Sequence, residues 1–117
     1  AVRKIVREKA LALKLSLVDQ TKLVTAASEL ARNTIKYGGG GEVLVAELLD
    51  GSSHGVQFMF IDNGPGITNT AKALEDGYTT GGGLGLGLGG SKRLVDEFDL
   101  YTEPGKGTAV TISKWKR

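Results

Sequence analysis

The run G-G-G-L-G-L-G-L-G-G, residues 81–90, is the most unusual stretch of this sequence. The chain has 18 glycines in 117 residues, about twice their ordinary share of roughly 7%, and they are clustered. Each glycine costs conformational entropy on folding, so a run this dense needs a functional reason. Glycines at the start of a helix expose backbone N–H groups, which attract anions together with the helix dipole. The run therefore predicts a phosphate-binding segment, with a flexible lid as the structural alternative.

A second motif, D-N-G-P-G at residues 62–66, follows an apolar segment that is typical of a strand. The carboxylate of Asp62 should therefore lie where the sheet meets solvent. A carboxylate there can accept a hydrogen bond from an amino group such as the exocyclic amine of adenine, and Gly64 and Gly66 would let the backbone approach a flat ligand. The alternative is a plain turn, because N-G-P-G is favourable turn chemistry by itself.

Two further groups of polar residues complete the candidate site. Glu29, Asn33 and Lys36 fall within about 60° of one another on a predicted helix, where they could serve a nucleophile, a cation and a phosphate. The alternative is an ordinary solvated helix face. In G-K-G-T, residues 105–108, the hydroxyl of Thr108 could contact a ligand beside Asp62 if their two strands are neighbours. A glycine turn before a β-branched residue is the simpler interpretation of that motif.

Composition narrows the class of protein. The length predicts one domain over residues 1–117, and 40% hydrophobic with 24% charged residues is typical of a globular domain. The absence of cysteine excludes disulfides and thiolate metal sites, so a metal would be a hard cation such as Mg²⁺. The net charge of +2 does not favour nucleic acid, and no apolar run approaches the ~20 residues of a membrane span. We therefore expect a cytoplasmic protein that binds neither nucleic acid nor a membrane.

Hydrophobic periodicity predicts helices over residues 2–13, 19–37 and 87–97, the second capped by Asp19, and a short helix-like stretch over 70–76. Strands are predicted over 42–49, 56–61, 98–103 and 108–115, in two hairpins. This order indicates an α+β fold, in which helices pack on one face of a mixed, mostly antiparallel sheet.

Four motifs in this order, E-L-A-R-N, D-N-G-P-G, G-G-L-G-L-G-L and G-K-G-T, resemble the GHKL superfamily of gyrase, heat-shock chaperone, histidine-kinase and mismatch-repair ATPases. The stretches E-D-G-Y-T-T-G-G-G-L-G-L-G-L and S-K-R-L-V-D-E-F-D and the terminal S-K-W-K-R are similar to the switch serine/threonine kinases of the bacterial stressosome. The resemblance implies a two-layer α/β sandwich of the GHKL type. Such relatives normally carry a further N-terminal strand, which this sequence lacks.

The resemblance also implies a role for each candidate residue in binding ATP and Mg²⁺. Asp62 would bind the adenine amine, and Gly64 and Gly66 would shape the wall beneath the base. Asn33 would be the Mg²⁺ ligand, Lys36 a phosphate contact and Glu29 the general base. Gly83, Gly85 and Gly87 would line the triphosphate, Thr108 would support the adenine end, and residues 67–83 would form a lid.

The function implied by the resemblance is phosphorylation of serine or threonine on a partner protein. The implied partners are STAS-domain scaffold proteins of the stressosome, which are the substrates, and a metal-dependent serine/threonine phosphatase that the released kinase activates by contact. Two alternatives stay open. One is a regulatory binding module with a structural nucleotide, and the other is an anti-sigma factor kinase.

Overall fold

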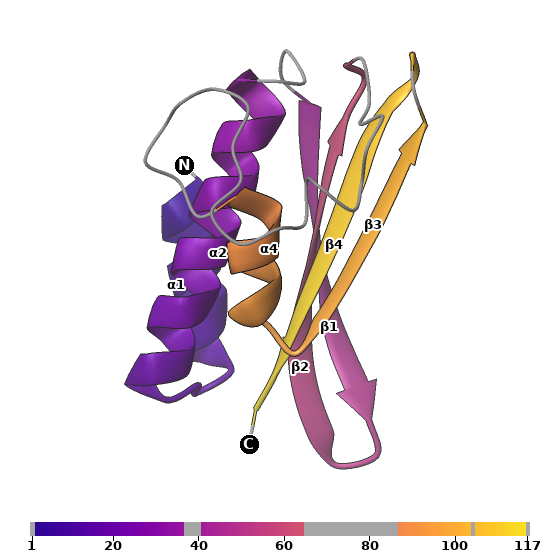
Figure 1. The fold of residues 1–117 in the computed structure, drawn as a ribbon. Coiled ribbons are helices and arrows are strands. Elements are labelled where there is room, and N and C mark those ends of the chain that lie inside the picture. The colour runs from indigo at the N-terminus through magenta and orange to yellow at the C-terminus, as the bar shows by residue number, and fades with distance from the viewer. Residues whose placement is uncertain (1, 37–40, 65–86, 104, 117) are drawn as a thin grey trace.

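The computed structural model describes residues 2–36, 41–64, 87–103 and 105–116 (Figure 1). The helices and strands in chain order are α1 (Val2–Ala12), α2 (Leu17–Lys36), β1 (Gly41–Asp50), β2 (Ser53–Asp62), α4 (Gly87–Arg93), β3 (Glu97–Glu103) and β4 (Gly107–Trp115). Among these, no helix is both long and apolar enough to cross a membrane.

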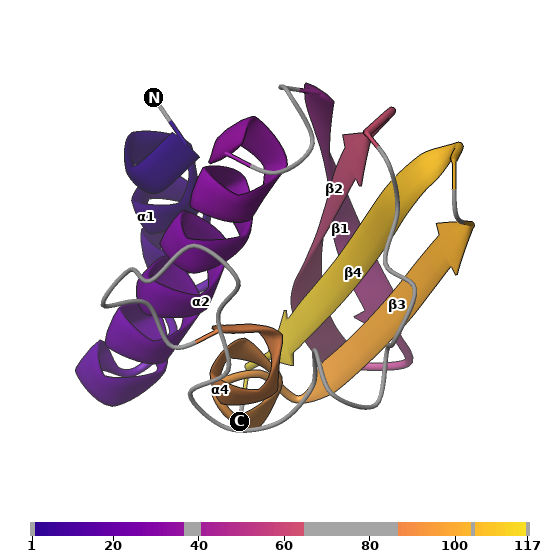
Figure 2. The ribbon, with the colours of Figure 1, turned by 45° about the horizontal axis from the view of Figure 1, so that its top comes forward.

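The four described strands form one sheet in the order β1-β2-β4-β3, and every neighbouring pair is antiparallel. Figures 1 and 2 show the helices stacked against one face of this sheet, with α2 between α1 and α4 on the helical side. The predicted α+β class, with a mostly antiparallel sheet and helices on one face, is confirmed. The hairpin of β1 and β2 is tighter than predicted, because Asp50 already pairs with Ser53.

The core lies between α2 and the two central strands. Phe58 and Phe60 of β2 and Ile112 of β4 point from the sheet toward Leu23 and Leu30 of α2, and all five side chains are buried. Alternate residues of a strand face the same side, which is why Phe58 and Phe60 both reach the helical layer. Burying a side chain of this size contributes about 1.5–3 kcal/mol, so the core fixes α2 against β2.

The start of α2 and the end of α4 differ from the sequence-based expectation. The backbone N–H of Asp19 donates to Ser16 Oγ over 3.1 Å, so Ser16 caps α2 and the prediction that Asp19 does so is wrong. A serine accepts from the N–H three residues later at a helix start, and Asp19 then lies in the first turn. The last helix ends at Arg93 rather than at 97, because Leu94 closes a turn on Ser91 and β3 begins at Glu97. The predicted stretch 70–76 lies outside the described residues.

A buried ion-pair network joins the two layers at the end of β4. Lys114 Nζ lies 3.4 Å from Asp19 Oδ1 of α2 and 3.4 Å from Asp96 Oδ1, just before β3. The other carboxylate oxygen of Asp96 accepts the backbone N–H of Trp115 over 2.8 Å. The Lys114 side chain is only 7% exposed, so its ammonium depends on these carboxylates in place of water.

Substitution of Lys114 should therefore destabilise the fold far more than loss of a surface ion pair. Lys114→Ala is expected to lower the free energy of unfolding by about 2–4 kcal/mol, because two partly buried carboxylates lose their cation. Lys106→Ala is the matched control. It removes a 3.3 Å ion pair with Glu103 whose side chains are 74% and 46% exposed, and should cost less than about 1 kcal/mol. Urea denaturation measures the free energy of unfolding of both variants. Equal losses in the two variants would contradict the structural role of the buried Lys114 ion pairs.

Candidate functional site

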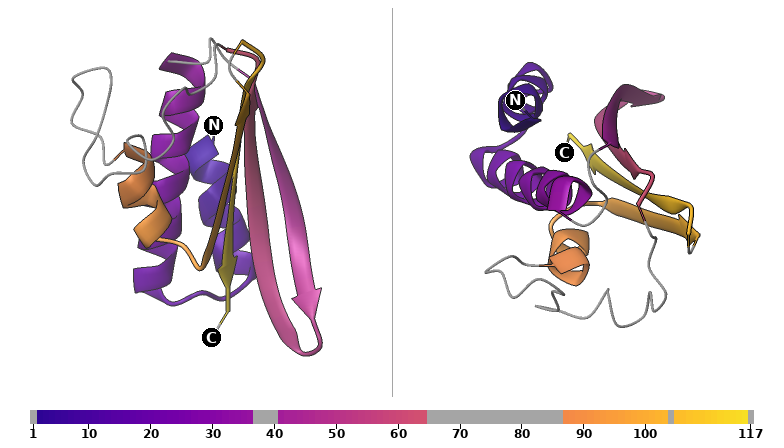
Figure 3. Two further views of the ribbon diagram at one scale, coloured as in Figure 1. Left: turned by 45° about the vertical axis from the view of Figure 1, so that its right-hand side comes forward. Right: turned by 90° about the horizontal axis from the view of Figure 1, so that it is seen from above.

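The predicted site residues come from elements that meet at one end of the molecule. In Figure 1 the C-terminal end of α2, the end of β2 and the start of β4 lie together at the top, and the left view of Figure 3 shows the same ends close together. These ends carry Asn33, Asp62 and Thr108 respectively. The fold therefore collects three of the predicted residues, distant in sequence, in one region.

Asp62 is the last residue of β2, and its strand partner in β4 is Thr108. The condition for Thr108 to act beside Asp62, that their two strands are neighbours, is therefore met. The Asp62 side chain is half-buried, and its Oδ1 accepts the backbone N–H of Gly64 over 2.9 Å. This bond fixes the carboxylate, while Oδ2 has no partner among the described residues and can accept a hydrogen bond from a ligand amine.

Two glycines flank the backbone of Asp62, one on each neighbouring strand. A Cβ on Gly41 of β1 would overlap the carbonyl oxygen of Ile61, and a Cβ on Gly107 of β4 would overlap the carbonyl oxygen of Asp62. Gly107 also has φ of +130°, a conformation that disfavours any other residue. Nothing local in the sequence predicts these long-range contacts, and G-K-G-T at residues 105–108 indicates only a turn.

A pair of hydroxyls holds Thr108 in place. Thr102 Oγ1 of β3 donates to the carbonyl oxygen of Gly107 over 3.2 Å and lies 3.0 Å from Thr108 Oγ1. Since Thr102 has a single hydroxyl hydrogen, Thr108 is the donor between the two hydroxyls. The oxygen of Thr108 then keeps acceptor capacity beside Asp62, as its predicted role at the adenine end requires. The sequence gives no signal for Thr102, because its role depends on the pairing of β3 with β4.

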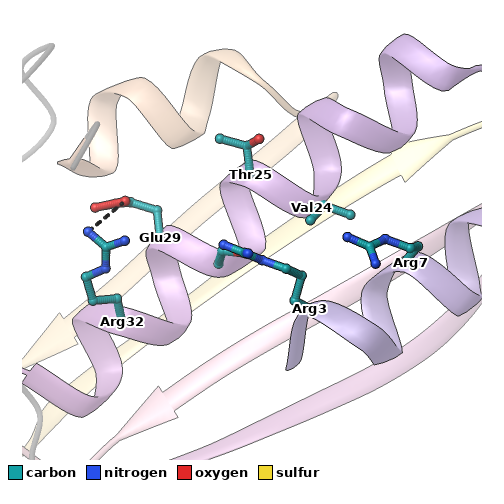
Figure 4. Close-up of a pocket in the computed structure, with 7 residues that line it drawn as sticks. Arg3, Arg7, Val24, Thr25, Glu29 and Arg32 are labelled. Atoms are coloured by element: carbon teal, nitrogen blue, oxygen red, sulfur yellow. Dashed lines mark hydrogen bonds and ion pairs between the residues drawn. The ribbon is translucent and has the colours of Figure 1, made fainter. Parts of the chain in front are cut away.

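Glu29 and Asn33 lie on α2 one helical turn apart, which corresponds to about 6 Å along the helix axis. Glu29 is 9% exposed, so the alternative of an ordinary solvated helix face is wrong at this position. Its Oε2 lies 3.8 Å from Nη1 of Arg32, the ion pair drawn in Figure 4. A carboxylate is rarely this buried without a role or a partner.

Asn33, the predicted Mg²⁺ ligand, lies within the described residues. It is half-buried, and within the described part of the chain its carboxamide has no hydrogen-bond partner. No group of three or more histidine, cysteine or carboxylate side chains that could hold a metal is found in that part. The carboxamide oxygen of Asn33 is a hard donor whose chemistry is compatible with Mg²⁺, an ion that takes few protein ligands and completes its shell with water and the oxygens of a substrate phosphate.

The remaining predicted residues are described only in part. Lys36 is the last residue of α2 and Gly87 the first of α4, so a helix does begin within the glycine run as predicted. Gly66, Gly83, Gly85 and the predicted lid over 67–83 lie outside the described residues.

Residues 18–117 match the family described as histidine kinase-, DNA gyrase B-, and HSP90-like ATPase. The chain belongs to this ATPase family, which is the GHKL superfamily that the four motifs predict. The NMR structure of the histidine kinase domain of the E. coli osmosensor EnvZ aligns with a TM-score of 0.52 and 21% identity, over 96% of this chain and 84% of that domain. That likeness supports the two-layer fold.

Comparison with individual relatives points to a narrower group within this family. Serine/threonine-protein kinase RsbT of Bacillus subtilis (strain 168) is 44% identical over 117 residues, which cover all of this chain and 88% of RsbT. An anti-sigma F factor of Clostridium acetobutylicum is 31% identical over 103 residues, covering 83% of this chain and 69% of that factor. The predicted resemblance to switch kinases of the RsbT type is confirmed, and the family supports ATP as the nucleotide.

The close approach at Gly107 generates a test of the site. Gly107→Ala should displace the end of β2 and weaken ATP binding roughly tenfold or more, because the new Cβ meets the carbonyl oxygen of Asp62. Gly105→Ala is the control. Gly105 also has positive φ, +82°, but a Cβ there has no neighbour within 4 Å. It should cost about 1 kcal/mol of stability and leave ATP affinity within twofold. Isothermal titration calorimetry measures both, and equal ATP affinities would contradict the contact's role.

Proposed function

We propose that this chain is an ATP-dependent serine/threonine protein kinase that acts as a switch in bacterial stress signalling. Its relationship to RsbT supports this class of reaction. The observation that carries the mechanism is the buried carboxylate of Glu29, one helical turn before a half-buried Asn33. Both lie on α2, whose C-terminal end is at the same end of the molecule as the end of β2.

The nucleotide would be held by residues at the shared end of the two layers. Oδ2 of Asp62 accepts the adenine amine, and the Thr108 hydroxyl supports the same edge of the base. Asn33 contributes one oxygen to Mg²⁺, which neutralises charge on the phosphates when bound. Phosphoryl transfer needs alignment and charge neutralisation more than covalent help from the protein, and in this proposal these residues serve both tasks.

Glu29 acts as the general base in this proposal. The hydroxyl oxygen of the acceptor attacks the γ-phosphorus while its proton passes to the Glu29 carboxylate. The bond between the γ-phosphorus and the β–γ bridging oxygen breaks, and ADP leaves. A positioned base of this kind contributes typically ~10²–10⁴-fold to the rate.

The protein partners follow from the same proposal. The phosphoacceptors are STAS-domain scaffold proteins of the stressosome, and the released kinase activates a metal-dependent serine/threonine phosphatase by contact. The similarity to anti-sigma F factors favours a second candidate function, that of an anti-sigma factor kinase. A regulatory module with a structural nucleotide is the third, and the buried carboxylate of Glu29 counts against it.

Incubation of the purified chain with labelled ATP, Mg²⁺ and a purified STAS-domain protein tests the proposal. Transfer of label to the STAS-domain protein is the expected result. Binding of that protein without label would contradict the kinase and favour the regulatory module. Absence of both binding and label, combined with binding of a sigma subunit, would favour the anti-sigma function.

A single substitution tests the base. Glu29→Gln keeps the size of the side chain but removes the proton acceptor, so transfer should slow by ~10²–10⁴-fold while ATP affinity stays within severalfold. Glu8→Gln makes the same chemical change at an exposed position of α1 and should leave the transfer rate unaltered. Single-turnover assays at saturating ATP measure the step, and full activity of Glu29→Gln would overturn the assignment.

A further inference from the structure

An arginine-rich groove of about 270 Å³ lies over α1 and α2, with Glu29 in its wall. Its charged residues are Arg3 and Arg7 of α1 and Glu29 and Arg32 of α2. Figure 4 shows Arg3 extending from α1 across α2, and Glu29 joined to Arg32 by their ion pair. Three guanidinium groups face one carboxylate, so the groove attracts anions. The net charge of the whole chain, +2, gives no indication of this local excess of positive charge.

The three arginines have different partners in the described structure. Arg3 Nε donates to Ser28 Oγ over 3.3 Å, a neutral acceptor on α2. Arg32 lies 3.8 Å from Glu29 and is 55% exposed. Arg7 is exposed and, among the described residues, has no hydrogen bond or ion pair. Within the described part of the chain, two of the three guanidinium groups have no carboxylate partner.

The position of Glu29 connects this groove to the reaction. The acceptor hydroxyl has to come within hydrogen-bond reach of the base that takes its proton. The groove is a hollow in the surface where a protein segment can approach Glu29, and that segment would lie against Arg7 and Arg32. A guanidinium pairs with a carboxylate through two parallel hydrogen bonds, so acidic side chains beside the acceptor would be favoured.

We propose that this groove binds an acidic segment next to the phosphoacceptor serine or threonine of the protein substrate, and that Arg7 and Arg32 select for it. The inference rests on the proposed kinase function. A carboxylate that pairs with Arg32 also competes for the guanidinium that Glu29 holds in the free protein. Arrival of the substrate then releases the base from its ion pair at the moment when the acceptor hydroxyl is close.

Charge reversal on α1 tests the groove. The probe is a purified, unphosphorylated STAS-domain protein, and both its Kd for the chain and its KM in label transfer are measured. Arg7→Glu should raise both constants roughly tenfold or more, because it replaces attraction of a carboxylate by repulsion. Lys4→Glu is the matched control, since it makes the same change of charge on an exposed residue of α1 that does not line the groove. It should change both constants less than twofold.

A second arm uses the substrate. Replacing the acidic residues beside its phosphoacceptor with lysine should weaken binding to the wild-type chain and restore binding to Arg7→Glu. Raising the ionic strength from 0.05 M to 0.5 M should raise the wild-type KM and change that of Arg7→Glu much less, because salt screens the attraction. ATP affinity, measured in the same samples, reports whether the groove instead belongs to the nucleotide site.

The outcomes of these experiments separate failure of the groove proposal from failure of the kinase proposal. Equal Kd and KM values for the wild type and Arg7→Glu would overturn the proposal that the groove binds the substrate. A loss of ATP affinity in Arg7→Glu that matches its loss of substrate affinity would do the same. If the wild type binds the STAS-domain protein in an Arg7-dependent way but transfers no label, the groove stands as a docking surface and the kinase proposal fails. If the wild type neither binds nor labels that protein, both proposals fail for this class of substrate.

Discussion

At the end of β2 three backbones approach one another more closely than side chains would allow. Gly41 and Gly107 lack a Cβ at the two points where it would overlap the carbonyl oxygens of Ile61 and Asp62. The central strand can therefore stay paired on both sides up to its last residue, and that residue is a carboxylate fixed by the N–H of Gly64. Every proposed contact with the nucleotide base depends on this close packing.

The opposite end of the molecule keeps the helical and sheet parts of the site in register. Asp19 of α2 pairs with Lys114 of β4, and the site residues lie farther along the same two elements. Asn33 is about 21 Å along α2 from Asp19 at 1.5 Å per residue, and Thr108 is about 20 Å along β4 from Lys114 at 3.3 Å per residue. The buried ion pair thus sets how far each element reaches, and the apolar core between them prevents α2 from sliding.

Features that depend on a short stretch of sequence could be predicted, whereas features that depend on packing between distant segments could not. The strand ending at Asp62 and the strand starting at Thr108 could each be predicted, because an apolar run before D-N-G and a β-branched residue after a glycine turn are local signals. Their pairing could not, because it joins segments distant in sequence. The burial of Glu29 could not, because it depends on how neighbouring elements pack around α2. Lys114 gave no signal either, since a lysine in a basic terminal stretch is usually solvated. Thr102 and Gly107 gain their roles only when β3, β4 and β2 are paired.

The central claim is that Oδ2 of Asp62 recognises the adenine amine. Calorimetric titration of the wild type and of Asp62→Asn with the Mg²⁺ complexes of ATP and inosine triphosphate tests it most directly, because inosine carries a carbonyl oxygen where adenine carries the amine. The account predicts that the wild type binds ATP at least about tenfold more tightly than inosine triphosphate and that Asp62→Asn loses this preference. Equal affinity of the wild type for both nucleotides, or unchanged ATP binding by Asp62→Asn, would contradict it.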